Sequence, residues 1–172
     1  MERILAQLDS MHRKLLATIT PIDQEDFARR PSEAEWSVAE VVHHLYLVEQ
    51  RVLKEMEDGL ARPPQRPGLR QRLIPLRLLV GSRVVRVKAP KGVQPLSPPS
   101  KEAVIENYNR VRADLKEFCA QHGRARLEQV IFKHPFLGDF DGVRAVSFAG
   151  YHELRHYKQI QEIVKKICES KR

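Results

Sequence analysis

The sequence predicts an all-α protein that folds as a four-helix bundle, and three observations support this fold class. Four segments repeat apolar residues at helical spacing, residues that cap or end helices stand at their borders, and no convincing pair of strands is present. A long irregular segment separates the second helix from the third. The length of 172 residues suits one domain with a buried core, so we expect residues 1–172 to form a single domain.

The first two helices have clear borders. Apolar residues recur at helical spacing over residues 1–18, before a proline ends the run. The second helix opens at Ser37, which forms an S-x-x-E capping box with Glu40, so that each side chain accepts a hydrogen bond from an otherwise unpaired backbone N–H. We expect Gly59 and the Pro-Pro pair that follows to end this helix.

The proline-rich residues 61–99 form the crossing segment. Within it, residues 69–87 are compatible with a short helix or with two extended pieces. The third helix is expected to begin at Ser100, a residue typical of an N-cap, and to end at Gly123.

The last helix carries the most distinctive motif. It follows an expected loop over residues 134–142 and should run from the N-cap residue Asp141 to Cys168. Residues 152–156 read H-E-x-x-H, a pattern that places two zinc ligands and a general base on one helix of a metalloprotease.

The helical rotation of about 100° per residue predicts where the histidines point. His152 and His156 share one face, which continues in six apolar residues: Ala145, Phe148, Ala149, Ile160, Ile163 and Ile167. On the second helix His44 borders the apolar stripe, whereas His43 should face solvent or a loop. We therefore predict that His44, His152 and His156 point inward, where they could form a three-nitrogen metal site.

Two other interpretations of these histidines are less compatible with the sequence. A single histidine on an apolar face is more often a hydrogen-bonded core residue, but two of them one turn apart are satisfied together by one metal ion. The protease interpretation fails because Glu162 and Glu169 lie on the same helix and no third ligand stands at the extended-motif positions. We therefore interpret Glu153 as a carboxylate on the helix surface rather than a general base.

Two motifs resemble those of the DinB-like (YfiT-type) superfamily. The first is a Trp-Ser-x-x-Glu opening followed by His-Leu, matched by Trp36, Ser37, Glu40, His44 and Leu45. The second is a His-Pro-x-x-Gly loop before a helix with His-x-x-x-His and Gln-Ile, matched by His134, Pro135, Gly138, His152, His156, Gln159 and Ile160. Residues 88–105 also resemble the stretch before the family's third helix. The resemblance implies a bundle whose metal is held by His44, His152 and His156.

Three neutral imidazoles leave a divalent metal, zinc or nickel, with open positions, as in catalytic sites. The resemblance implies thiol S-transferases that use low-molecular-weight thiols such as bacillithiol or mycothiol, a thiol-dependent isomerase, and proposed metal-dependent hydrolases. We expect a metal-dependent transferase or hydrolase that acts on a small-molecule substrate. The alternatives are a non-catalytic metal-binding or dimerisation module, with the homodimer expected from family analogy, and a nucleic-acid binder.

Two further residues bear on the mechanism. Glu49 lies on the core side of its helix, where it either pairs with an inward arginine or a backbone N–H, or orients a ligand histidine or accepts a proton. Trp36, the only tryptophan, is expected to pack against the start of its helix rather than to stack on a substrate.

The net charge of +8 is concentrated in one segment. Residues 62–91 contain seven arginines, two lysines and no acidic residue. We consider three roles for this segment. The first is a solvated loop, and the second is a lining at the mouth of the site that holds a carboxylate-bearing thiol or substrate. The third is a contact with nucleic acid or with an anionic membrane surface. Its lack of aromatic residues argues against nucleic acid, because no side chain there would stack on bases.

Three observations bear on location and redox state. No apolar run approaches the roughly 18 residues of a membrane span, and the first 20 residues lack an uninterrupted secretory segment. We therefore expect a cytoplasmic protein. Cys119 and Cys168 stand in separate segments and form no C-x-x-C motif, so we expect both to be reduced and structural.

Overall fold

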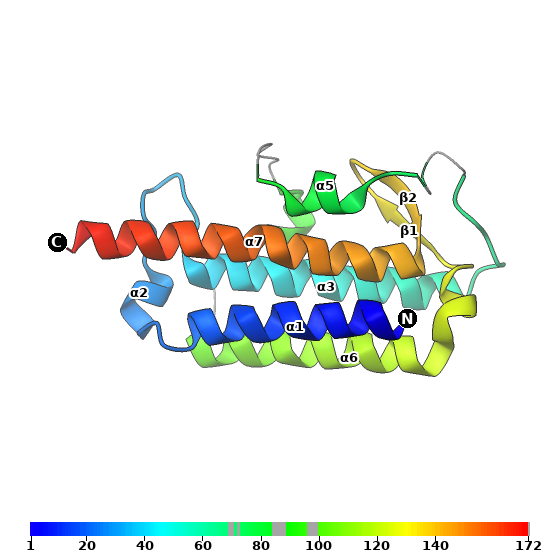
Figure 1. Cartoon of the computed structure of the whole chain (residues 1–172), viewed down its shortest axis with the longest axis horizontal. Helices are drawn as coiled ribbons and strands as arrows, with labels where there is room; N and C mark the ends of the chain where they lie inside the picture. Colours follow the sequence, from blue (N-terminus) through cyan, green and yellow to red (C-terminus); the bar gives the residue numbers. More distant parts are fainter. Residues whose placement is uncertain (69–70, 72, 84–88, 96–99, 172) are drawn as a thin grey trace.

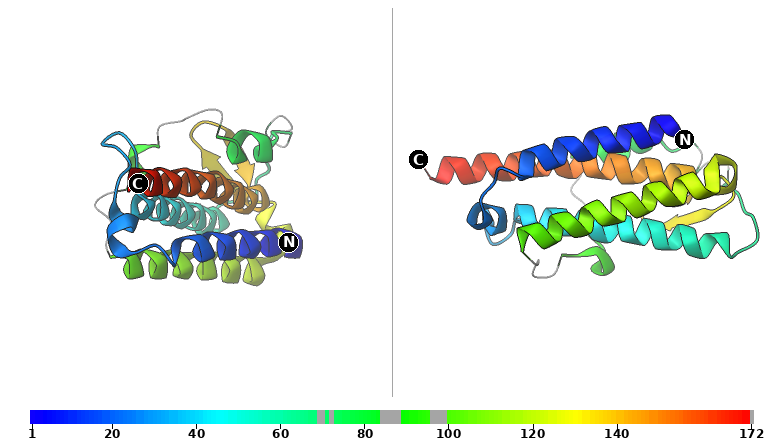
Figure 2. Two further views of the ribbon diagram at one scale, coloured as in Figure 1. Left: turned by 60° about the vertical axis from the view of Figure 1, so that its left-hand side comes forward. Right: turned by 90° about the horizontal axis from the view of Figure 1, so that it is seen from below.

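The computed structural model describes residues 1–68, 71, 73–83, 89–95 and 100–171. Four long helices form the predicted bundle: α1 (Glu2–Ile19), α3 (Val38–Leu60), α6 (Lys101–Leu127) and α7 (Gly142–Ser170). α7 packs against α1 and α3, and α3 packs against α6. In Figure 1, α1 and α7 run in one direction and α3 and α6 in the opposite direction. Figure 2 shows the four helices from two more sides.

The parallel arrangement of α3 and α6 explains the long crossing segment. α3 ends at the opposite end of the bundle from the start of α6, so the chain has to return along the bundle between them (Figure 1). The described part of this segment contains α5 (Leu76–Gly81), which packs on α7, and the short 3-10 helix η1 (Lys91–Val93). The short-helix alternative for this stretch is therefore present, while residues 69, 70, 72 and 84–88 lie outside the described residues.

The predicted helix starts are confirmed. At the start of α3 the backbone N–H of Glu40 donates to Ser37 Oγ (3.2 Å), and the Ser37 N–H donates to Glu40 Oε2 (2.9 Å). Ser100 and Asp141 cap α6 and α7 with their side-chain oxygens. Each such cap typically contributes about 1 kcal/mol of helix stability.

Two glycines act differently from the prediction. Gly123 does not end α6 but kinks it, with φ 68° and ψ 169°, a conformation open almost only to glycine, and one more turn follows. α3 ends at Leu60, one residue after Gly59 and before the Pro-Pro pair, so its predicted end is confirmed, although Gly59 itself still belongs to the helix. A Cβ atom at Gly59 would stand 2.5 Å from Val130 Cγ1, so this glycine permits close packing rather than ending the helix.

The prediction of a loop over residues 134–142 and of no strand pair was wrong. An antiparallel hairpin joins β1 (Ile131–His134) to β2 (Gly138–Asp141), and Phe132 stands opposite Phe140. The first strand, IFKH, has two adjacent apolar residues and the second, GDFD, has only one, so neither shows the apolar–polar alternation by which a strand is recognised. Gly138, with φ 78°, begins the return strand.

A second element was not predicted, the five-residue helix α2 (Gln24–Ala28). Asp23 caps it by accepting a hydrogen bond from the Asp26 N–H at 2.8 Å. Its Phe27 is fully buried and joins the apolar core formed with α3, α6 and α7.

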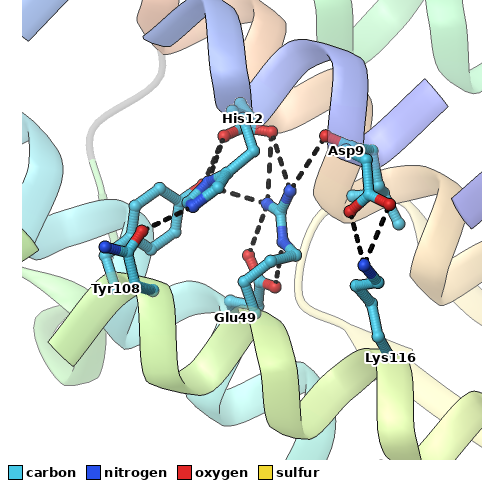
Figure 3. Close-up of polar contacts among 9 residues, drawn as sticks. Asp9, His12, Glu49, Tyr108 and Lys116 are labelled. Carbon is cyan, nitrogen blue, oxygen red and sulfur yellow. Dashed lines mark hydrogen bonds and ion pairs between the residues drawn. The ribbon is translucent and has the colours of Figure 1, made fainter. Parts of the chain in front are cut away.

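Arg112, a buried residue of α6, bonds to residues of the other three long helices. Figure 3 shows the polar cluster to which Glu49, His12 and Tyr108 belong. Arg112 of α6 donates two hydrogen bonds to the carboxylate of Glu49 in α3, at 2.6 and 2.8 Å. It also donates to Glu153 Oε2 of α7 at 3.1 and 3.2 Å, and to the Leu8 carbonyl of α1 at 3.2 Å. The Tyr108 hydroxyl accepts from Arg112 and donates to Glu153 Oε1 at 2.9 Å.

Further polar contacts join α1 to the same cluster. The two ring nitrogens of His12 lie 3.2 Å from Glu153 Oε1 and 2.8 Å from Asn109 Oδ1. Nearer the surface, Lys116 of α6 pairs with Asp9 of α1 (Figure 3). The bundle therefore has a polar centre in which every bond joins two different long helices or adjacent turns of α6.

Burial makes this cluster energetically demanding. The side chains of Arg112, Glu49 and Glu153 are at most 3% exposed. Burial raises the pKa of Glu49, and the charge of Arg112 opposes that rise. Removing one partner would leave a buried charge uncompensated, which typically costs about 3–5 kcal/mol.

The described helices include none that is both long enough and apolar enough to cross a bilayer. Cys119 is buried and Cys168 is exposed, and both are free thiols. Burial raises the pKa of Cys119 to about 11, which suits an unreactive core residue.

We expect the substitution Arg112→Met to lower the free energy of unfolding by about 3–5 kcal/mol, because it leaves two buried carboxylates without a cation. Urea denaturation at neutral pH measures the loss. Arg124→Met is the control, since Arg124 is 59% exposed and pairs with Glu128 at the surface. Equal stability of the two variants would contradict the role assigned to Arg112.

The same measurement tests Gly59. Alanine in a helix interior is favoured over glycine by about 1 kcal/mol, and Gly150→Ala should realise that gain, because its Cβ would make only ordinary contact with Leu8. Gly59→Ala should instead destabilise the protein by about 1 kcal/mol, because overpacking against Val130 outweighs the helical gain. A Gly59→Ala variant as stable as Gly150→Ala would show that Val130 moves away freely.

Candidate metal centre

The structure brings together three histidines from two helices. α3 carries His44, which is 3% exposed, and α7 carries His152 and His156, the latter 7% exposed. The ring centroid of His44 lies 5.1 Å from that of His152 and 4.8 Å from that of His156. The rings of His152 and His156 are 4.5 Å apart. Among the described residues this is the group of side chains suited to hold a metal ion.

The hydrogen bonds of two rings determine which nitrogens are available. His44 Nδ1 lies 2.6 Å from the Val93 carbonyl oxygen, and His156 Nδ1 lies 2.8 Å from Gln159 Oε1. A carbonyl oxygen only accepts, so each Nδ1 carries the hydrogen and each Nε2 keeps its lone pair. Arg83 donates to Gln159 Oε1 at 3.0 Å, which establishes that the amide oxygen, and not the nitrogen, faces the histidine.

The bare nitrogens converge. His152 Nε2 lies 3.4 Å from His44 Nε2 and 3.2 Å from His156 Nε2, and all three atoms lie within 4.8 Å of one another. Two nitrogens bound to zinc at about 2.05 Å with a tetrahedral angle stand about 3.3 Å apart. The donor set therefore fits a divalent ion. A small rotation of the His44 or His156 ring would bring the Nε2 atoms of these two residues to the same spacing.

The protonation state also suits a metal. Burial lowers the pKa of His44 to about 4 against the opposing hydrogen bond to Val93. The pKa values of His152 and His156 are held well below their usual range, first by burial and then by the neighbouring imidazoles. All three rings are consequently neutral at physiological pH, the form in which histidine binds metals.

The crossing segment orients one of these rings. Arg83, which follows α5, donates to both oxygens of Glu162 at 3.1 and 2.8 Å while it also contacts Gln159. Gln159 is thereby held between an arginine and His156. Such partners of a metal-binding histidine set its orientation and its tautomer.

A cavity of about 530 Å³ opens beside the three histidines. Aromatic and aliphatic side chains make up much of its wall, including Trp36, Phe132 and Phe148. The Phe148 ring stacks on His152 with centroids 5.4 Å apart. The arrangement is that of a small-molecule site, in which an apolar wall surrounds a few polar groups.

The prediction that Glu153 lies on the helix surface was wrong, because its side chain is 0% exposed and accepts hydrogen bonds from Arg112 and Tyr108. Its position four residues after Ala149 and three before His156 was the available signal, since both lie on the buried face. Glu49 was expected to pair with an inward arginine or a backbone N–H, or to act on a ligand histidine or a proton. The structure shows the first of these, a pairing with an inward arginine.

Other predicted residues are placed as follows. His43 was expected to face solvent or a loop, but it is half-buried and stacks on Tyr46 with centroids 6.1 Å apart; it is not part of the three-histidine group. Trp36 stands at the start of α3 but also lines the cavity, with its ring 5.1 Å from that of His44. Its expected role in packing alone is therefore incomplete.

Several polar groups of the cavity wall were given no individual role by the sequence. His134 lines the cavity, and burial followed by the charge of Arg51 lowers its pKa to about 4. Arg51 and Arg155 line it too, as does Arg83. Of the described cations in the basic segment 62–91, only Arg83 lines the cavity. Four further cations of the segment lie outside the described residues, namely Arg70, Arg72, Arg86 and Lys88.

Comparisons with known proteins agree with this architecture. YuaE of Bacillus subtilis (strain 168), an uncharacterized protein, is 26% identical over 147 residues, covering 85% of this chain and 88% of YuaE. The crystal structure of TT2238, a four-helix bundle protein, superposes with a TM-score of 0.62 at 23% identity, covering 94% of this chain and 98% of TT2238.

A second solved structure, YfiT from Bacillus subtilis, is described as a probable metal-dependent hydrolase with an unusual four-helix bundle topology. It superposes with a TM-score of 0.67 at 12% identity, covering 96% of this chain and 86% of YfiT. At these identities both structures establish the fold alone. The family model of the DinB superfamily matches residues 7–160, which is most of the chain. The protein therefore belongs to the DinB superfamily.

Proposed function

We propose that this protein is a metal-dependent enzyme in which His44, His152 and His156 hold one divalent ion, zinc or nickel, beside the site of a small-molecule substrate. The observation that carries the proposal is the convergence of three Nε2 atoms, of which two are left bare by hydrogen bonds at Nδ1. The cavity that adjoins them supports a substrate site rather than a structural site. The similarity to YfiT supports the same class of activity.

The residues around the histidines have separable roles. Val93 and Gln159 orient the rings of His44 and His156, and aromatic side chains line the cavity beside them. A divalent ion would supply a Lewis acid that makes a water molecule or a low-molecular-weight thiol more acidic. The proposal therefore covers a hydrolase, which uses water, and a transferase, which uses a thiol.

Glu153 does not serve as the general base that an H-E-x-x-H motif provides in a metalloprotease. Its oxygens accept hydrogen bonds from Arg112 and Tyr108 inside the bundle, and its side chain does not line the cavity. The motif is thus divided between two tasks, since its histidines face the cavity and its glutamate faces the polar centre of the bundle.

The second candidate is a metal-binding or dimerisation module without catalytic activity. The cavity favours an enzyme, because a module that only bound an ion would not require an apolar chamber of about 530 Å³ beside it. Nucleic-acid binding through the basic segment has less support, because Arg83 is engaged by Glu162 and Gln159.

Protein purified without a histidine tag should contain about one zinc or nickel ion per chain, measured by inductively coupled plasma mass spectrometry, because the three imidazoles form a single site. His152→Ala should lose that ion and any metal-dependent activity. His43→Ala is the matched control and should keep both, since its ring stacks on Tyr46 and is not one of the three converging imidazoles. Metal-free protein, or full activity in the presence of a chelator, would rule out the proposal.

Gln159→Ala should weaken zinc binding by about 10–100-fold, the usual effect of removing the hydrogen-bond partner of a ligand histidine. Competition with a chromophoric chelator measures this affinity. Gln159→Glu retains an acceptor and should restore most of it. Gln161→Ala, an exposed residue two positions away, should have no effect, and an equal loss in that variant would point to a general change in α7.

A further inference from the structure

His134, the last residue of β1, lies in the cavity wall with one ring nitrogen left for a ligand. Its Nδ1 accepts hydrogen bonds from the backbone N–H groups of Phe136 (3.2 Å) and Leu137 (3.1 Å), so the hydrogen of the neutral ring is on Nε2. Within the described part of the chain no group accepts a hydrogen bond from Nε2, and this atom is not among the side-chain atoms buried without a partner. The wall therefore presents an N–H donor that a ligand can reach.

Aromatic rings place this donor next to the three histidines. The His134 ring meets the Phe148 ring edge-on at a centroid distance of 4.9 Å, and it lies 5.8 Å from the Phe140 ring. Phe148 in turn stacks on His152, with centroids 5.4 Å apart. One aromatic ring thus contacts both His134 and a member of the three-histidine group, and all three side chains line the same cavity.

The ring of His134 carries no charge at physiological pH. Burial, followed by the positive charge of Arg51, lowers its pKa to about 4 against the opposing charge of Glu55. The ring consequently keeps a single hydrogen at neutral pH, and the turn assigns that hydrogen to Nε2. A neutral donor of this kind suits an uncharged acceptor, because it has no charge with which to balance an anion.

The cations of the cavity wall already have partners. Arg51 donates to Glu55 at 2.8 Å, and Arg83 pairs with Glu162 at 2.8 Å. Arg155 donates to a backbone carbonyl of the crossing segment. A ligand that brought a negative charge would have to compete with these contacts, whereas an uncharged ligand would leave them in place.

The remainder of the wall is apolar. Trp36, Val48, Phe132 and Phe148 line the cavity, and Phe136, which is 59% exposed, lines it from the hairpin turn. Exposed apolar side chains at a cavity favour a ligand with an apolar body, because such a ligand would cover them.

We propose that the cavity binds a small uncharged carbonyl compound with an apolar body, and that His134 Nε2–H donates a hydrogen bond to its carbonyl oxygen. The inference rests on the proposed function, because it treats the cavity beside the three histidines as the substrate site. When a nucleophile adds to the carbonyl carbon, the electron pair of the C=O π bond moves to the oxygen, and a donor already bonded to that oxygen stabilises the charge.

Two substitutions separate the two nitrogens of His134. The side-chain oxygen of asparagine can take the place of Nδ1, so His134→Asn keeps the acceptor for the turn and removes the donor. The side-chain nitrogen of glutamine can take the place of Nε2, so His134→Gln keeps a donor and removes the acceptor. His122→Asn is the matched control, because His122 contacts Phe118 and does not line the cavity.

The only tryptophan provides the measurement, because Trp36 lines the cavity. Its fluorescence is titrated with 4-phenylbutan-2-one and with 2-methyl-4-phenylbut-1-ene, in which a methylene group replaces the carbonyl oxygen. Chelator is present throughout, so that no metal can bind the carbonyl oxygen. The ratio of the two affinities isolates the contribution of that oxygen, because the two compounds share the same apolar body.

We expect His134→Asn to lower the ratio of ketone to alkene affinity about 5-fold, the usual net effect of one hydrogen bond. His134→Gln and His122→Asn should keep the ratio of the unsubstituted protein. Urea denaturation should show the reverse order, since His134→Gln deprives the turn of its acceptor and His134→Asn does not. This opposition distinguishes binding of a ligand from a purely structural role of His134 in the hairpin.

Three results would overturn the inference: no saturable binding of the ketone, an unchanged ratio in His134→Asn, or a lowered ratio in folded His134→Gln. Circular dichroism establishes which variants are folded. If His134→Asn is unfolded, the result with His134→Gln decides, because that variant must keep the ratio.

Metal analysis separates the inference from the proposed function. Protein without metal whose ketone binding depends on His134 would contradict the metal proposal and support the carbonyl site. Protein that contains one metal ion, but whose ratio does not respond to His134→Asn in chelator, would contradict the carbonyl site and leave the metal proposal intact.

Discussion

The arrangement of the bundle depends on the pairing of Arg112 with two buried carboxylates. Glu49 and Glu153 repel each other in a medium of low dielectric constant, and the guanidinium between them supplies the positive charge that offsets this repulsion. The two carboxylates lie on α3 and α7, the helices that also carry the three histidines. The cluster consequently holds these two helices in the axial register at which the imidazoles meet.

The geometry of an ion cluster is more selective than that of apolar packing. Leucine and valine side chains tolerate a shift of one helix along another, whereas a bidentate carboxylate–guanidinium pair does not. We therefore regard the polar centre as a determinant of alignment rather than as a large source of net stability, because burying the charges costs much of what their attraction returns.

Much of the helical framework could be predicted from the sequence. Capping residues such as Ser37 and Asp141 act locally, and their bonds form wherever a helix begins. The hairpin could not be predicted, because Phe132 and Phe140 acquire their pairing from contacts with Phe148 in another element. Gly59 was misinterpreted for a similar reason, since its role depends on Val130, seventy-one positions later.

In the candidate site, too, features set by the local sequence could be predicted and features set by distant residues could not. The inward direction of the His44 and His156 side chains follows from the rotation per residue of a helix, so it could be predicted from each helix alone. The acceptors of their Nδ1 atoms could not all be found in this way. Gln159 lies on the same helix as His156, but Val93 comes from the crossing segment, whose course no local pattern determines. Glu153 was placed on the surface because its partner, Arg112, is forty-one positions away in the sequence.

The chain order of the bundle has a consequence for biosynthesis. His44 belongs to the second long helix, whereas the other two imidazoles belong to the last, and Val93 lies between them in the sequence. A nascent polypeptide emerging from the ribosome therefore holds no more than one of the three imidazoles until α7 is synthesised. Capture of a metal ion at this centre would be a late event of maturation, coupled to closure of the tertiary structure and governed by the metals then accessible in the surrounding compartment.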